Sequence, residues 1–101
     1  MIYLVVLITA KEGKLKELIR LINETAIAVR QEKGCVEYFA TIDADTGLPP
    51  QAVDKSRVVL LERWESLEAQ KAHLETPHMK AYFKKQAGLV EGSVLMALKE
   101  A

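Results

Sequence analysis

Hydrophobic and polar residues follow two different periods along this chain, and the changes of period separate strands from helices. Residues Ile2–Ile8 are apolar throughout, which predicts a central strand that is covered on both faces. From Lys14 onward, apolar residues recur three and four positions apart, as Leu15, Leu18, Ile19, Ile22, Ala26 and Val29. This spacing predicts a long amphipathic helix, and Gly34 stands where a glycine commonly ends one.

Three more strands and two shorter helices are predicted in the rest of the chain. The strands cover residues 35–42, 57–65 and 93–99, which alternate apolar and polar side chains or form short apolar runs. Ser66 can cap one helix, and Thr76 followed by Pro77 predicts the start of another. Residues 43–56 are polar and longer than a tight hairpin needs, which predicts a lid or a dimer-contact loop.

The resulting order, β-α-β-β-α(α)-β, is typical of the α+β class and of the ferredoxin-like plan. In that plan a four-stranded antiparallel sheet carries its helices on one face. We expect residues 1–101 to form a single domain of this kind. No helices remain to cover the other sheet face, which would expose a large apolar surface on a monomer. The sequence therefore predicts a homodimer in which two sheets pack face to face.

Composition and charge exclude several classes of partner. The charges of the 14 basic and 14 acidic residues cancel, so the sequence predicts no basic surface that would bind nucleic acid or an anionic membrane. The apolar run at Ile2–Ile8 is too short to span a bilayer and lacks the features of a signal peptide. The single cysteine, Cys35, is typical of a reducing compartment. We expect a soluble cytoplasmic protein.

The candidate chemistry is concentrated between Glu62 and Phe83, which include the single tryptophan and both histidines. Glu62 and Trp64 share one face of the predicted third strand, and an unpaired buried carboxylate is costly. Glu62 is either a site residue or an acid that pairs with Arg63, Lys71 or water. Trp64 is either a platform for a substrate or a core residue.

The two histidines are the candidate bases, because imidazole exchanges protons near neutral pH. His73 lies on one helical stripe with Gln70, and His78 falls in the first turn of the next helix, where the helix dipole favours neutral imidazole. The alternative is that both are ordinary residues at a corner between helices. They stand five apart across a helix break and no third ligand is evident, so we expect no metal site.

Several segments together resemble the antibiotic-biosynthesis monooxygenase family, and within it the bacterial quinol monooxygenase branch. The segments are Lys11–Lys14, Glu32–Cys35, Glu62–Ser66 and Ala72–Tyr82, with the apolar first strand. The resemblance spans nearly the whole chain. It implies a dimeric α+β barrel with a pocket between the sheet and the helices of each protomer.

The resemblance also implies oxidation of a small aromatic quinol or phenol by O₂ without metal, flavin or other cofactor. A quinol hydroxyl has a pKa of about 10, so a base must help to form the oxidisable anion. On this hypothesis His73 or His78 is the base, and Glu62 orients a histidine or the substrate. The substrate would be bound by Trp64, Tyr82, Met79 and Tyr38.

Other branches of the fold are alternatives. Haem-degrading relatives use an asparagine on the first strand and a histidine in the later helix. This chain has no such asparagine, and Phe83 occupies the expected ligand position, so haem degradation is not expected. A branch that processes the phosphorylated signal autoinducer-2 would need an anion-binding cluster, for which Arg63, Lys71 and Lys80 are candidates. A non-enzymatic dimeric module for small-molecule binding or stress response is a further alternative.

Overall fold

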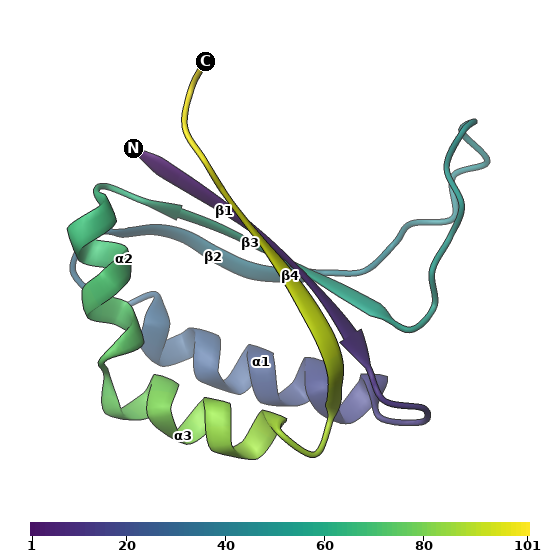
Figure 1. Cartoon of the computed structure of the whole chain (residues 1–101), viewed down its shortest axis with the longest axis horizontal. Coiled ribbons are helices and arrows are strands. Elements are labelled where there is room, and N and C mark those ends of the chain that lie inside the picture. Colours follow the sequence, from purple (N-terminus) through teal and green to yellow (C-terminus); the bar gives the residue numbers. More distant parts are fainter.

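The computed structural model describes residues 1–101 and contains four strands and three helices (Figure 1). In chain order they are β1 (Ile2–Ala10), α1 (Leu15–Val29), β2 (Cys35–Thr41), β3 (Arg57–Trp64), α2 (Leu67–Leu74), α3 (Pro77–Gln86) and β4 (Val90–Leu98). The order and the fold class are those predicted from the sequence. Most boundaries agree within two residues, although β4 begins at Val90 rather than at residue 93.

The four strands form one antiparallel sheet in the order β2-β3-β1-β4, which is the ferredoxin-like arrangement. Strand β1 is central, as its apolar sequence predicted, and pairs with β3 and with β4. The β1–β4 register shifts between Thr9 and Ala10, opposite Gly92 and Val90. Gly92 therefore lies inside the last strand, where a residue without a side chain fits an irregular pairing.

All three helices lie on one face of the sheet, with α1 and α3 side by side beneath it (Figure 1). The buried stripe of α1, formed by Leu18, Ile22, Ala26 and Val29, supplies its side of the core. On β3 every second residue is buried, namely Val58, Leu60, Glu62 and Trp64. This confirms the predicted sharing of one strand face. A tryptophan and a glutamate thus lie in the layer between sheet and helices.

The opposite face of the sheet is apolar and is left uncovered by the chain. Residues of the central strands on that face include Val5 and Leu7 of β1 and Val59 and Leu61 of β3, opposite each other in register. The face continues over Phe39, Val94, Met96 and Leu98, which are all exposed. Within one chain, β1 is therefore covered on one face and not on both as predicted.

The turn before β2 differs from the expectation for Gly34. Helix α1 ends with Arg30 as its C-cap in ordinary helical geometry, so Gly34 is not the helix-ending glycine that the spacing suggested. Instead, Gly34 adopts φ +87° in the following turn, and a Cβ there would lie 2.5 Å from the Cβ of Ala69. Glycine is required here by backbone conformation and by the close approach of α2.

The two predicted helix starts are confirmed in detail. The hydroxyl of Ser66 accepts a hydrogen bond from the backbone N–H of Ala69, and that of Thr76 accepts one from Met79, with Pro77 in the first turn. The Thr76–Pro77 break turns the chain between α2 and α3. This turn places His73 and His78 against the same neighbouring segment.

Residues 43–56 form a long connection that extends away from the sheet (Figure 1). Its base is held by an ion pair in which Arg57 donates to Asp43 at 2.9 Å. Its role as a lid or dimer contact stays a prediction.

None of the helices is both long and apolar enough to cross a membrane.

Candidate active site

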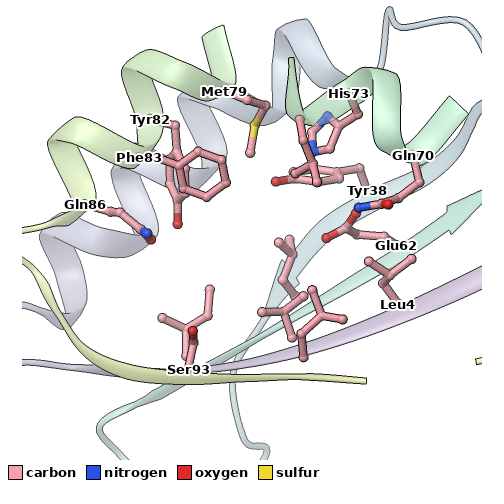
Figure 2. A pocket seen from close by; sticks show the side chains of 15 residues that line it. Leu4, Tyr38, Glu62, Gln70, His73, Met79, Tyr82, Phe83, Gln86 and Ser93 are labelled. Atoms are coloured by element: carbon pink, nitrogen blue, oxygen red, sulfur yellow. The ribbon is translucent and has the colours of Figure 1, made fainter. Parts of the chain in front are cut away.

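A cavity of about 150 Å³ lies between the sheet and helices α2 and α3. Figure 2 shows Tyr82, Phe83 and Met79 reaching into it from α3, with Tyr38 and Glu62 entering from the sheet. Its floor consists of apolar strand residues, namely Leu4, Val6, Ile8, Leu60 and Leu95. An apolar cavity of this volume is large enough for one benzene-sized ring.

Glu62 is the carboxyl group of the cavity. It is buried, and its Oε1 accepts a 2.9 Å hydrogen bond from the indole Nε1–H of Trp64. No ion pair forms, because Arg63 lies on the other sheet face and donates to Glu37. Burial raises the pKa of Glu62 to about 7, and the nearby charge of Glu32 acts in the same direction. The hydrogen bond from Trp64 opposes both effects. The group therefore titrates near neutral pH.

His73 lies beside Glu62 on the cavity wall and is almost completely buried. Its Nδ1 is 2.8 Å from Oε2 of Glu32, and its ring lies 4.7 Å from that of Trp64 and 5.5 Å from that of Tyr38. Burial lowers the pKa of His73, while the hydrogen bond and the charge of Glu32 oppose this effect. With Nδ1 bonded to a carboxylate, Nε2 is the nitrogen left to accept a proton.

His78 does not line the cavity. Its Nε2 is 2.7 Å from the same Oε2 of Glu32, and the rest of the ring lies at the outer surface, in a shallow hollow with Glu24 and Lys85. The structure thus brings the two histidines together on one carboxylate but directs only His73 to the cavity. Sequence reasoning did not single out Glu32, because 41 residues separate it from His73 and only the fold brings them together.

The predicted substrate-binding residues divide in a similar way. Tyr38, Met79 and Tyr82 line the cavity, whereas Trp64 is fully buried behind Glu62 and does not reach the cavity. The Tyr82 hydroxyl is buried without a hydrogen-bond partner, and burial raises the pKa of Tyr82 to about 12. Burial likewise raises the pKa of Tyr38. Both phenols are therefore neutral donors near pH 7.

Three polar cavity residues were not predicted to bind substrate. Gln70, Gln86 and Ser93 line the cavity, and only Gln70 lay on a stripe that the sequence singled out, the one that carries His73. The cationic residues proposed for anion binding are elsewhere. Arg63 lies on the open sheet face, Lys80 pairs with exposed Glu75, and neither these residues nor Lys71 lines the cavity. The cavity has no cation to bind a phosphate.

A ferredoxin-like sheet with helices on one face and an apolar, carboxyl-bearing cavity between them defines the class of this protein. It is a small α+β protein built around a ligand-sized internal site. The chain belongs to the antibiotic biosynthesis monooxygenase family, whose model matches residues 1–85.

The chain is similar to an Escherichia coli K12 protein named "Probable quinol monooxygenase YgiN", with 40% identity over 67 residues. The match covers 66% of this chain and 61% of that protein, so the chain spans less than two thirds of its relative. Among solved structures, PA3566 from Pseudomonas aeruginosa has a TM-score of 0.84 at 22% identity, covering 99% of this chain and 93% of its own. Rv0793 from Mycobacterium tuberculosis has a TM-score of 0.83 at 21% identity, and the match covers 99% of this chain and 94% of Rv0793. At these identities the two structures support the fold alone.

Proposed function

We propose that this protein is a monooxygenase that oxidises a small aromatic quinol or phenol with O₂, without metal or flavin. The observation that carries the proposal is Glu62, a carboxyl group with a pKa of about 7 in an otherwise largely apolar cavity of about 150 Å³. A base that titrates near the working pH is suited to proton transfer. Family membership and the similarity to YgiN support the same reaction class.

The chemistry begins with proton removal. Glu62 takes the proton of a quinol hydroxyl, and the resulting anion gives up electrons to O₂ far more readily than the neutral quinol does. One oxygen atom is added to the ring and the other leaves as water, so that quinol and O₂ give a hydroxyquinone and water. The ring loses four electrons in total, and O₂ takes them up. Apolar walls keep water away from the reactive intermediates.

The cavity residues divide the remaining tasks. His73, with Nε2 free and Nδ1 on Glu32, is the second proton-accepting group. Trp64 positions Glu62 from behind, and the unpartnered hydroxyl of Tyr82 is placed to bind a substrate oxygen. A buried polar group without a partner costs free energy that a bound ligand can recover. His78 is given no catalytic role, because it does not line the cavity.

The protein is further proposed to act as a homodimer through the open sheet face. Val94, Met96 and Leu98 of β4 lie on this face and are each more than 40% exposed. The cavity is also lined by Ser93 and Leu95 of this same edge strand. Packing of a second copy against the sheet would therefore cover apolar surface and stiffen the cavity wall.

Oxygen uptake with a panel of one-ring and two-ring hydroquinones tests the activity. The protein is first dialysed against EDTA, and spontaneous oxidation is measured without protein. We expect uptake above this baseline, with one ¹⁸O atom from ¹⁸O₂ in the hydroxyquinone and no accumulation of hydrogen peroxide. Uptake that yields unlabelled quinone and peroxide would indicate an oxidase. A ligand-dependent rise in Tm without any uptake would instead support a binding module.

A further inference from the structure

Three metal-ligating atoms from distant parts of the chain converge beside the cavity. They are Oε2 of Glu32, in the turn between α1 and β2, Nδ1 of His73 in α2 and Nε2 of His78 in α3. All three atoms lie within 4.8 Å of one another. The expectation of no metal site rested on the lack of a third ligand, and the fold supplies one in Glu32.

The donor set selects one class of cation. Two imidazoles and a carboxylate suit Zn²⁺ and neighbouring divalent transition metals, whereas Ca²⁺ and Mg²⁺ are held mainly by oxygen atoms. We propose that Glu32, His73 and His78 form a binding site for such an ion, with Zn²⁺ as the representative case. Water completes the coordination from the surface side, where the His78 side chain is 28% exposed.

Small movements are enough to admit the ion. The two nitrogens lie 2.8 and 2.7 Å from the shared oxygen, which are hydrogen-bond distances. Metal bonds of about 2.0–2.1 Å at tetrahedral angles separate neighbouring ligand atoms by about 3.3 Å, so each nitrogen–oxygen pair must widen by roughly half an ångström. The two nitrogens, which lie within 4.8 Å of each other, must reach the same separation. The ring of His73 is fixed by Trp64 and Tyr38, so Glu32 and His78 make the adjustment.

The site is structural or regulatory in nature, because Glu32 and His78 do not line the cavity. A bound ion joins the α1–β2 turn to α2 and α3 and holds His73 through Nδ1. This leaves the ring proton on Nε2, so the ion-loaded His73 donates toward the cavity and only the ion-free form can accept a proton there. The inference does not depend on the proposed oxidation, and binding can be measured without any substrate.

Titration calorimetry and thermal unfolding of the EDTA-dialysed protein with ZnCl₂ test this site. We expect one ion per chain with a Kd of about 10 µM and a Tm rise of roughly 5–10 °C at 100 µM Zn²⁺. His78→Ala and Glu32→Gln should each weaken binding at least tenfold, while Glu24→Gln, a matched change in the hollow beside His78, should leave it unaltered. His78 is half-buried at the surface, so its truncation tests the site without opening the core.

Cobalt supplies a second readout. Co²⁺ in a tetrahedral site of this kind should give visible absorption bands that His78→Ala abolishes. Absence of binding at 100 µM Zn²⁺, or binding that is equally strong in His78→Ala and Glu32→Gln, would overturn the site. Either result would leave the oxidation of quinols to be judged separately by the oxygen assay.

Discussion

The indole N–H of Trp64 donates a 2.9 Å hydrogen bond to Oε1 of Glu62, two residues earlier on the same face of β3. The alternation of a strand makes this contact possible, since residues i and i+2 project to the same side. One carboxylate oxygen is thereby fixed, and the other is left for the cavity. The bond also gives a buried carboxyl the only side-chain partner it has.

Replacing Glu62 with Gln should abolish most of the oxidation. The amide has nearly the same volume but cannot accept the substrate proton, and loss of a general base costs roughly 100-fold or more in kcat/KM. Oxygen uptake at saturating and limiting quinol checks this. Glu68→Gln, an equivalent change on the exposed side of α2, is the control and should retain full activity. Activity of Glu62→Gln within threefold of the parent would remove Glu62 from the mechanism.

The pH dependence of kcat/KM should report the same group. Ionised Glu62 is the base, and its pKa is about 7 in the free protein, so kcat/KM should rise with pH to a plateau with a midpoint near 7. The profile is measured between pH 5 and 9 after correction for spontaneous quinol oxidation. Residual activity of Glu62→Gln should lack this midpoint. A profile that falls across the same range would contradict a carboxylate base.

Stability should respond to pH in the opposite sense. The folded pKa of Glu62 is about 7 against 4.5 for the unfolded chain, so the folded state holds the proton more tightly between these values. Its stabilising contribution is present below pH 4.5 and declines as pH rises through 7, by up to about 3 kcal/mol. Urea unfolding at pH 5 and 8 measures the decline, and Glu62→Gln should reduce it. If the free energy of unfolding fell equally between pH 5 and pH 8 in the parent and in Glu62→Gln, burial of Glu62 would not be the cause of the decline.

Removing the indole donor should shift the kinetic midpoint upward. Trp64→Phe keeps an aromatic ring but leaves Glu62 without the hydrogen bond that favours its charged form, so the pKa of Glu62 should rise further above 7. The smaller ring also leaves space in a fully buried position and should cost about 1–3 kcal/mol of stability. The pH profile separates the two effects, because a purely structural role would lower stability and leave the midpoint in place.

Local signals in the sequence predicted much of the fold. The alternation of Val58, Leu60, Glu62 and Trp64 predicted that all four share one strand face, and the caps at Ser66 and Thr76 predicted two helix starts. These features depend on residues a few positions apart. The roles of Gly34 and Glu32 depend on contacts with Ala69 and with the histidines, which lie 35 or more residues away.

The sequence predicted which segments contribute to the cavity better than it predicted how their side chains are arranged there. Glu62 and His73 reach the cavity from one strand and one helix, as their stripes suggested. Trp64 shares the strand face of Glu62 but lies behind it, and His78, in the next helix, lies toward the surface. The reason is that the cavity occupies only part of the layer between sheet and helices. Sequence periodicity gives the face of an element and cannot give the depth of a cavity beneath it.

Gly34→Ala should destabilise the protein more than an alanine at another positive-φ glycine. A Cβ at Gly34 adds backbone strain at φ +87° and meets Ala69 at 2.5 Å, for a total cost of roughly 2–4 kcal/mol. Gly13 has φ +74° but no atom within 4 Å of an added Cβ, so Gly13→Ala isolates the backbone strain at about 1 kcal/mol. Urea unfolding of both variants measures the difference. Equal costs would show that α2 can move away from the turn.

A charge on the open sheet face should separate the proposed dimer. Val94 is 61% exposed and pairs with Leu7 across β1 and β4, so both side chains lie on the uncovered face. Val94→Arg would place a cation against apolar surface of a second copy and should convert a dimer at micromolar concentration into a monomer, while the fold remains intact. Ile27→Arg makes the same kind of change at a 66% exposed position of α1, on the helical side, and should leave the dimer unchanged. Sedimentation of the parent and both variants decides the matter: a parent that sediments as a monomer, or a Val94→Arg variant that stays dimeric, would exclude association through this face.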